Sequence, residues 1–390
     1  MLDKNKKKHL LMISFIISIL YALHFAIPLY VTSTYLANFI QTSYIGIVYS
    51  FMGLFSFLLS MYLGRFVKKY HSYNTSLLIL LIGFVSTLSL SFLTETWMIV
   101  VAFVLSNTCS FLFFSILNFF IEEFDSDGET GETRGIFLTL MNVGILFAAL
   151  SAGQILSLYS FSVLWTISAA CLIPIMFLIR HNYAHIPDPK FRNPSMLSAV
   201  KHVMHNKNIF AVFLALLSLE CFFVTMSIYA PTVLKNNLDI SLETYLSFIL
   251  PFALIPFVVF PYQLGVIADK RYGEKEMLVI GIIMLIIIGI VFPNISNVSM
   301  LTVALFLFIS RIAASLVESM CTIYFYKKVN AGEISIIALF SSIRVIAYII
   351  MPLFSSVILY SGLSIAYIFY FLALMMIYSL YKLKNLVDTK

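Results

Sequence analysis

Twelve apolar stretches, each about long enough to cross a lipid bilayer, fill nearly all of the 390-residue chain. A transmembrane helix needs about 20 mostly apolar residues to cover a hydrocarbon core of about 30 Å. Because backbone polar groups in lipid must be satisfied within their own segment, we expect an all-α integral membrane protein. The predicted spans are 10–31, 44–63, 75–94, 97–121, 135–157, 161–180, 208–231, 244–266, 277–294, 299–326, 334–358 and 364–382.

The basic residues lie almost entirely on one side of the membrane if the N-terminus is cytoplasmic. Of the 24 Lys and Arg, 21 then fall in cytoplasmic segments, Lys235 lies outside, and Arg311 and Arg344 lie within spans. Loops rich in Lys and Arg stay in the cytoplasm, so we predict that both termini are cytoplasmic. The net charge of +6 is then explained by basic flanks facing an anionic leaflet, not by nucleic-acid binding.

The composition also excludes several classes of protein. With 61% hydrophobic and 11% charged residues, the chain differs from a soluble domain, which is about half apolar and a quarter charged. The four cysteines lie in apolar spans without paired spacing, which favours small apolar residues over disulfides. The chain contains no Walker loop, Rossmann glycines or H-E-x-x-H pattern, so we do not expect an enzyme, and ATP-driven transport would need a separate subunit. Few Gly and Ala with abundant Ile, Lys and Asn favour a bacterial plasma (inner) membrane.

The longest polar segment divides the chain in the middle. Residues 181–207 contain three prolines and a cluster of His and Lys, with six spans before them and six after. Two six-helix halves joined by a cytoplasmic linker are a common plan for secondary transporters. We therefore predict two pseudo-symmetric bundles, at 1–180 and 208–390, joined by the linker 181–207.

Two short cytoplasmic loops, 205 positions apart, form an internal repeat. They read Ser60-Met-Tyr-Leu-Gly64-Arg65-Phe66-Val67-Lys68-Lys69 and Gly265-Val-Ile-Ala-Asp269-Lys270-Arg271-Tyr272-Gly273-Glu274-Lys275. The second loop resembles the signature loop of the major facilitator superfamily, G-x-x-x-D-R/K-x-G-R/K-R/K. Gly265 and Asp269 align directly, whereas Gly273 comes one residue late. In the first copy, Ser60 replaces the first Gly and Gly64 replaces the Asp.

This resemblance implies a transporter that works by alternating access, with a central cavity lined by spans 1, 4, 7 and 10. It also implies a cytoplasmic gate, in which Asp269 would act with Lys270 or Arg271. Gly265 would allow two helices to approach closely. The other gate residues are Gly273 and, in the first copy, Arg65. The alternative is a basic cytoplasmic loop with a turn glycine.

Four ionisable residues lie inside the predicted spans of the second half. Glu220 is in span 7, Arg311 and Glu318 are in span 10, and Arg344 is in span 11. A charge at a helix centre costs about 2.5–3.5 kcal/mol on insertion scales, so such residues usually face a partner or a water-filled cavity. Arg311 and Glu318 are seven positions apart and therefore share a helix face. Three of the four charges fall on spans that the resemblance assigns to the cavity.

These charges allow two interpretations. In the first, Glu220 carries a proton or contacts the substrate, while Arg311 controls its protonation or binds an anionic group. In the second, Glu220 and Arg311 form a static buried pair that fixes helix packing. Glu318 fits either interpretation, and Arg344 either joins the site or braces span 11.

The first half contains polar residues that are weaker candidates for lining the cavity. They are His24 in span 1, and Asn107 and Asn118 in span 4. A histidine can titrate near neutral pH, although a lone His in an apolar helix is more often an interhelical hydrogen-bonding group. Since this half has no charge in mid-membrane, we expect an apolar and aromatic cavity wall, which suits an amphipathic ligand better than a sugar.

Neither the acidic loop nor the linker histidines fit a metal-binding motif. An EF-hand starting at Asp125 needs Gly at position six and Glu at position twelve, where this chain has Thr130 and Ile136. The linker histidines are interpreted as solvated, so we expect no metal and no cofactor. A different feature, the prolines of span 8 at five-residue steps, predicts a kinked helix: they are Pro251, Pro256 and Pro261.

Together these features predict proton-coupled export, by an antiporter, of a small amphipathic molecule. The expected partners are this solute, protons and the lipid bilayer, and we expect a monomer. Uptake of an organic anion or nutrient, attracted by Arg311 and Arg344, is the alternative within transport. A non-transporting membrane receptor or a lipid-handling protein on the same scaffold is the alternative outside it.

Overall fold

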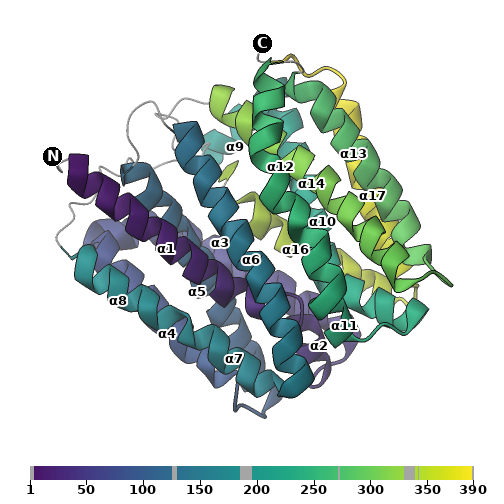
Figure 1. Cartoon of the computed structure of the whole chain (residues 1–390), viewed down its shortest axis with the longest axis horizontal. Coiled ribbons are helices and arrows are strands. Elements are labelled where there is room, and N and C mark those ends of the chain that lie inside the picture. The colour runs from purple at the N-terminus through teal and green to yellow at the C-terminus, as the bar shows by residue number, and fades with distance from the viewer. Residues whose placement is uncertain are drawn as a thin grey trace. The chain divides into compact units, whose positions relative to one another are not determined.

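The computed structural model describes residues 4–124, 130–184, 196–270, 273–328, 339–340 and 342–388. Within these ranges every regular element is a helix, and twelve helical segments are long and apolar enough to cross a membrane (Figure 1). This confirms the predicted all-α fold with twelve spans. The cytoplasmic location of the termini stays a prediction.

The chain divides into two compact units, one formed by residues 1–40 and 51–191 and the other by 41–50 and 192–390. The first contains α1 (Lys4–Leu29), α2 (Thr32–Ala37), most of α3 (Thr42–Tyr70), α4 (Ser72–Ser89), α5 (Thr96–Phe124), α6 (Thr130–Leu158), α7 (Phe161–Ala170) and α8 (Leu172–Asn182). The second contains α9 (Met196–His205), α10 (Lys207–Leu238), α11 (Leu242–Thr244), the π turn η1 (Tyr245–Ile249), α12 (Leu250–Lys270), α13 (Glu274–Val291), the 3-10 turn η2 (Phe292–Asn294), α14 (Met300–Lys328), α16 (Ile343–Tyr360) and α17 (Ala366–Leu383).

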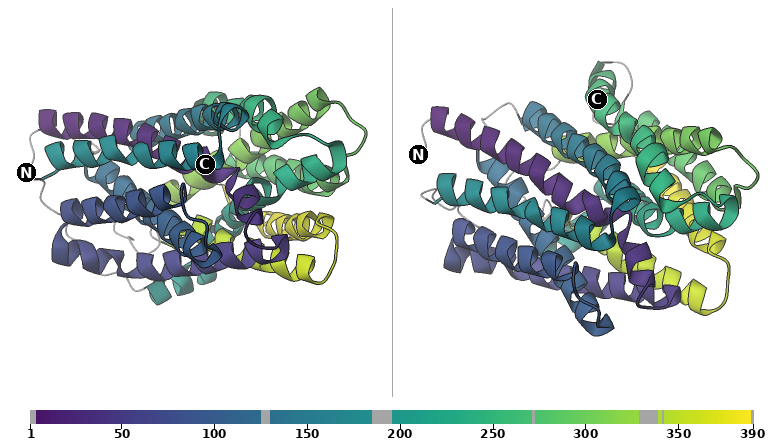
Figure 2. Two further views of the ribbon diagram at one scale, coloured as in Figure 1. Left: turned by 90° about the horizontal axis from the view of Figure 1, so that it is seen from below. Right: turned by 60° about the horizontal axis from the view of Figure 1, so that its bottom comes forward.

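In the first unit, α1 packs against α5, α6, α7 and α8, and α4 packs against α5, α7 and α8. The further views show these helices running alongside one another (Figure 2). Their shared core is rich in aromatic rings, and Phe120 lies 4.7 Å from the ring of Tyr183. The Tyr183 hydroxyl is 2.8 Å from the Ser14 hydroxyl. This contact ties the end of α8 to α1, because a buried tyrosine hydroxyl needs a hydrogen-bond partner.

In the second unit, α10 occupies the centre. It packs against α14, α16 and α17. Of its most apolar 18-residue stretch, 78% is buried, which is the highest share among the twelve spans. Asn206 starts the helix, since its side-chain oxygen accepts hydrogen bonds from the amides of Asn208 (3.1 Å) and Ile209 (3.2 Å). Asparagine is among the preferred N-cap residues because it satisfies amides that the first turn leaves free. A polar side chain in the middle of α10, such as that of Glu220, therefore lies in the interior of this unit.

The first turns of α3 group with the second unit and pack on α16. The Ser50 hydroxyl donates to the Ile349 carbonyl over 2.9 Å, and the rings of Tyr49 and Tyr348 stack at 6.0 Å. A Cβ atom at Gly46 would overlap the Pro352 carbonyl. A residue without a side chain is therefore needed for this close helix approach.

Helix irregularities fall near prolines. Span 6 is divided into α7 and α8 at Cys171, three residues before Pro174. In span 8 the irregularity is the π turn before Pro251, whereas α12 runs on through Pro256 and Pro261. Proline lacks an amide hydrogen and its ring collides with the carbonyl four residues earlier. The wider π turn relieves both problems.

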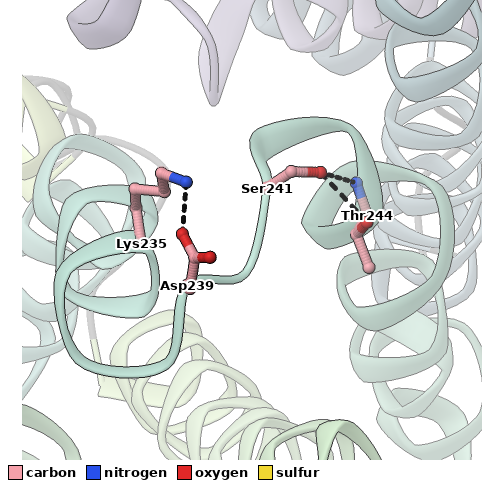
Figure 3. Close-up of polar contacts among 4 residues, drawn as sticks. All are labelled: Lys235, Asp239, Ser241 and Thr244. Carbon is pink, nitrogen blue, oxygen red and sulfur yellow. Dashed lines mark hydrogen bonds and ion pairs between the residues drawn. The ribbon is translucent and has the colours of Figure 1, made fainter.

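The loop between α10 and α11 holds two local interactions (Figure 3). Lys235 Nζ lies 2.5 Å from Asp239 Oδ1, and this hydrogen bond lowers the pKa of Asp239. The Ser241 hydroxyl accepts a hydrogen bond from the Thr244 amide over 3.2 Å and starts α11. Asp239 ends α10 in the left-handed conformation, with φ 53°.

We predict that Asp239→Val lowers the free energy of unfolding by about 1–2 kcal/mol, because a side chain with a branched Cβ is strained in this conformation. Asp239→Gly also removes the exposed ion pair, but glycine adopts the left-handed conformation without strain. This variant should therefore be about as stable as the wild type. Thermal unfolding in detergent measures both variants. Equal losses in the two variants would contradict the assignment of the cost to backbone strain.

Candidate functional site

The charged residues of the second unit meet around α10. Glu220, in the middle of that helix, is buried, with 6% of its surface exposed. Arg344, near the start of α16, donates to it from Nε to Oε2 over 2.9 Å and from Nη2 to Oε1 over 3.1 Å. Two parallel N–H···O bonds between a guanidinium and a carboxylate are the strongest geometry for such a pair. Glu220 and Arg344 therefore form a bidentate ion pair between α10 and α16.

Glu318 adds a second carboxyl group to this pair. It lies on α14 and is partly buried, and the charges of both Arg344 and Glu220 act on it. Among the residues that the structure describes, no Lys, Arg or His lies within ion-pair distance of Glu318. Arg344 thus pairs with Glu220 alone, and Glu318 lies within the electrostatic influence of both members of that pair. We call Glu220, Glu318 and Arg344 the carboxylate triad.

Arg311 is not part of the triad, which corrects the expectation that it pairs with Glu220. It lies on α14, 2% exposed, with its Cζ atom 5.7 Å from the ring centres of both Phe222 and Phe223. The reason is helix geometry: Arg311 precedes Glu318 by seven residues, which is about 10 Å along a helix axis. Arg311 therefore reaches the aromatic residues that follow Glu220 on α10, while Arg344 reaches Glu220 itself.

His24 holds helices of the first unit together. Its Nδ1 lies 2.9 Å from the Ser168 carbonyl, and its Nε2 lies 3.0 Å from the Ser110 hydroxyl. Since a carbonyl only accepts, Nδ1 carries the hydrogen. The Ser168 hydroxyl donates back to the His24 carbonyl over 2.8 Å. His24 is thus a fully bonded link between α1, α5 and α7, beside a cavity of about 10 Å³, roughly the space of one water molecule.

The two asparagines of α5 bond within their own helix. The side-chain amide of Asn107 donates to the Phe103 carbonyl, and that of Asn118 to the Phe114 carbonyl, each over 3.0 Å. Both side chains are partly buried. Within the described ranges no three His, Cys, Asp or Glu side chains are grouped so that they could hold a metal ion.

The predicted gate residues are described only in part. Arg271 lies outside the described residues, and for Gly265, Asp269 and Lys270 the structure describes only the helical backbone at the end of α12. Arg65 is exposed, with its guanidinium 5.3 Å from the ring centre of Tyr62. The gate roles of these five residues therefore stay predictions.

Gly273, the sixth gate residue, contacts the C-terminal segment instead. A Cβ atom at Gly273 would overlap the Asp388 carboxylate, which accepts a hydrogen bond from the Lys275 amide over 3.2 Å. Asp388 thereby caps the start of α13, a place where negative charge is stabilised. The Tyr324 hydroxyl donates to the Val387 carbonyl over 2.8 Å. These contacts dock the C-terminal segment, residues 384–388, on α13 and α14.

A buried carboxyl group lies under this segment. Glu274 is fully buried and 2.9 Å from Lys327 Nζ, and it shares a hydrogen bond with the Asp388 side chain. Burial, and then this hydrogen bond, raises the pKa of Asp388. Sequence reasoning missed Asp388 and Lys327. The acidic Glu274 at the start of an apolar helix was the available signal, and it does not identify its partners.

We predict that docking of the C-terminal segment weakens as the pH rises. A carboxyl group with a raised pKa binds its proton more tightly in the docked state, so its contribution is present below its ordinary pKa and is lost as the pH passes the raised value. Leu386 is buried and Asn385 is exposed. The ratio of the thiol reactivity of Leu386→Cys to that of Asn385→Cys should therefore rise with pH. Adding Asp388→Asn, which mimics the protonated form, should flatten this ratio. A ratio that is independent of pH in the wild-type background would contradict the assignment.

The chain resembles known proteins both in its sequence and in its fold. The sequence model of the Major Facilitator Superfamily matches residues 10–337. A mutant of the nucleoside transporter NupG has a similar structure, with a TM-score of 0.72, 15% identity, and coverage of 96% of this chain and 99% of that chain. A bacterial homologue of the human lysosomal transporter Spinster, solved inward-facing and unoccupied, gives a TM-score of 0.70, 13% identity, and coverage of 98% and 96%. No curated protein matches the chain.

Proposed function

Since this chain belongs to the Major Facilitator Superfamily, we propose that it is a secondary transporter that works by alternating access and exports a small amphipathic solute in exchange for protons. It would act as a monomer in a bacterial plasma membrane. The observation that carries the proposal is the carboxylate triad, in which Arg344 is bonded to Glu220 and the charges of both act on a second carboxyl group, Glu318, inside a neighbouring span.

The triad supports proton coupling by its charge balance. With both carboxyl groups ionised, Glu220, Glu318 and Arg344 carry a net charge of −1, which is costly inside a membrane. One proton on either carboxyl group makes the triad neutral. We suppose that Arg344 pairs with Glu220 in one conformation and with Glu318 in another. The carboxyl group that is not paired with Arg344 would hold the proton more tightly, so the preferred proton site changes with the conformation. Proton binding and release would then be linked to the conformational change, as coupled transport requires.

The surroundings of the triad support an amphipathic solute. Phe222 and Phe223 follow Glu220 on α10, and the ring of Phe223 lies 5.7 Å from that of Phe257 on α12. Sites for small molecules are mostly apolar, with a few polar groups that fix orientation. A sugar would need more hydrogen-bonding groups than this region offers.

Uptake of an organic anion or nutrient stays the alternative within transport, and a receptor or lipid-handling role stays the alternative outside it. Proteoliposomes with a luminal pH indicator separate them. Solute entry that makes the lumen more alkaline indicates exchange with protons, whereas acidification indicates uptake with protons. An absence of solute-dependent proton movement across a panel of amphipathic solutes would overturn the proposal.

We predict that Glu220→Gln and Glu318→Gln each abolish solute-linked proton movement, because an amide cannot take up the proton. Both variants should still fold and insert, since an amide has nearly the shape of the carboxyl group. The matched control is Glu95→Gln, which changes an exposed carboxyl group outside the spans. Unchanged proton coupling in either triad variant would remove that residue from the mechanism.

A static packing pair would behave differently in a double-mutant cycle. Arg344→Gln should lower the free energy of unfolding by about 1–3 kcal/mol, because it leaves the buried Glu220 carboxylate without its partner. The double variant Glu220→Gln, Arg344→Gln should recover most of that loss. If the pair is only structural, the double variant also recovers proton coupling. We expect it to recover stability alone.

A further inference from the structure

Arg311 is a buried cation that the triad leaves without a counter-charge. Its residue is 2% exposed, and its Nε has no hydrogen-bond partner among the described residues. No ion pair to Arg311 is formed by any residue that the structure describes. An arginine side chain is charged in proteins. A buried donor without a hydrogen-bond partner is costly, so this position favours an occupant that supplies acceptors.

Ser315 presents a second unsatisfied group on the same helix face. It follows Arg311 by one turn on α14, is 1% exposed, and its hydroxyl has no hydrogen-bond partner within the described residues. Residues four apart on a helix have Cβ atoms about 5–6 Å from each other. The guanidinium and the hydroxyl can therefore donate to one ligand. An oxyanion such as a carboxylate or phosphate suits them, since its oxygens only accept.

The aromatic residues around Arg311 favour a ligand with an apolar body. Its guanidinium lies 5.7 Å from both the Phe222 and the Phe223 ring centres. Ring faces attract the cation but offer no acceptor to its N–H groups, which stay available for bidentate binding of an oxyanion. Phe222 is fully buried. A ligand at this place would contact ring carbons and N–H groups at once.

We propose that Arg311 and Ser315, flanked by Phe222 and Phe223, form a subsite for the oxyanion of the transported solute. The solute would then be an amphipathic organic anion, with a carboxylate, sulfonate or phosphate group on an apolar or aromatic body. This inference rests on the proposed transport function and adds the charge of the solute to it. The subsite is distinct from the proton-binding triad, because about 10 Å of α14 separates Arg311 from Glu318.

The test uses two probes that share one aromatic body, 1-naphthoate and the neutral 1-naphthamide. Binding to the purified full chain is measured by calorimetry at constant ionic strength. We expect 1-naphthoate to bind about tenfold more tightly than 1-naphthamide, as one charge-assisted hydrogen-bonding interaction supplies. Arg311→Gln should abolish this difference, Ser315→Ala should reduce it a few-fold, and Arg311→Lys should retain part of it. Equal binding of the two probes to the wild type would overturn the proposal.

Thermal unfolding gives an independent measurement in case a variant loses affinity for other reasons. Without anions, Arg311→Gln should be at least as stable as the wild type, because it removes an unpaired buried charge. The wild type alone should then gain stability from 1-naphthoate. An Arg311→Gln variant that is much less stable than the wild type, or that gains equally from 1-naphthoate, would contradict the subsite.

Additional measurements identify the ligand at this subsite and test it separately from the transport proposal. If inorganic phosphate or chloride stabilises the wild type as strongly as 1-naphthoate at the same concentration, the occupant is a small inorganic anion and the assignment to the solute is wrong. Binding of 1-naphthoate through Arg311 without any proton-linked flux would support the subsite and refute the transport proposal. If neutral solutes drive proton-linked flux, and this flux is unchanged in Arg311→Gln, the transport proposal would be supported and the subsite refuted.

Discussion

Leaving a polar group without a hydrogen bond in hydrocarbon costs free energy, and this cost determines the backbone structure and most polar side-chain contacts of the protein. It closes the backbone into helices and makes hydroxyl groups bond to carbonyls of their own helix, as Ser14, Ser18 and Thr225 each do with the carbonyl four residues earlier. The same cost explains the bidentate pairing of Glu220 with Arg344 and the fully bonded ring of His24. Against this background, Arg311 Nε and Ser315 Oγ are among the few buried side-chain atoms that have no hydrogen-bond partner within the described residues. Such atoms are rare in proteins and each needs an explanation, which the proposed oxyanion supplies at Arg311 and Ser315.

Two chemical tasks are separated along α14. Glu318 belongs to the triad that would hold the proton, and Arg311, two turns away, belongs to the subsite that would hold an anion. Both side chains project from one helix, so a shift or rotation of α14 changes both environments together. Linkage then requires reciprocity: whatever factor the proton contributes to anion affinity, the anion contributes to proton affinity. In the proposed mechanism, a helix that carries both groups would provide coupling without a long chain of contacts.

Hydropathy was sufficient to predict the twelve spans, because length and apolar composition decide whether a helix can cross a bilayer. It also located all four intramembrane charges. It could not assign the partner of Glu220, since Arg311 and Arg344 were both available and only the packing of α10 against α14 and α16 distinguishes them. Nor could it find the contact between Asp388 and the start of α13, which joins residues 113 positions apart in polar flanks without any periodic pattern. Sequence chemistry thus identified the ionisable groups, and helix register decided their pairing.

The π turn at Tyr245–Ile249 has a consequence for the evolution of α12. A π turn closes its hydrogen bonds over one residue more than an α turn does, so it accommodates an amino acid for which a regular helix has no place. Such a bulge is what a single-residue insertion leaves behind when the flanking segments keep their original packing. Shortening the turn by one residue should therefore restore an uninterrupted helix without rotating its neighbours. Pro251 would then lose the wider turn that accommodates its ring, so the length of this turn and the identity of residue 251 are expected to change together in descendants of this chain.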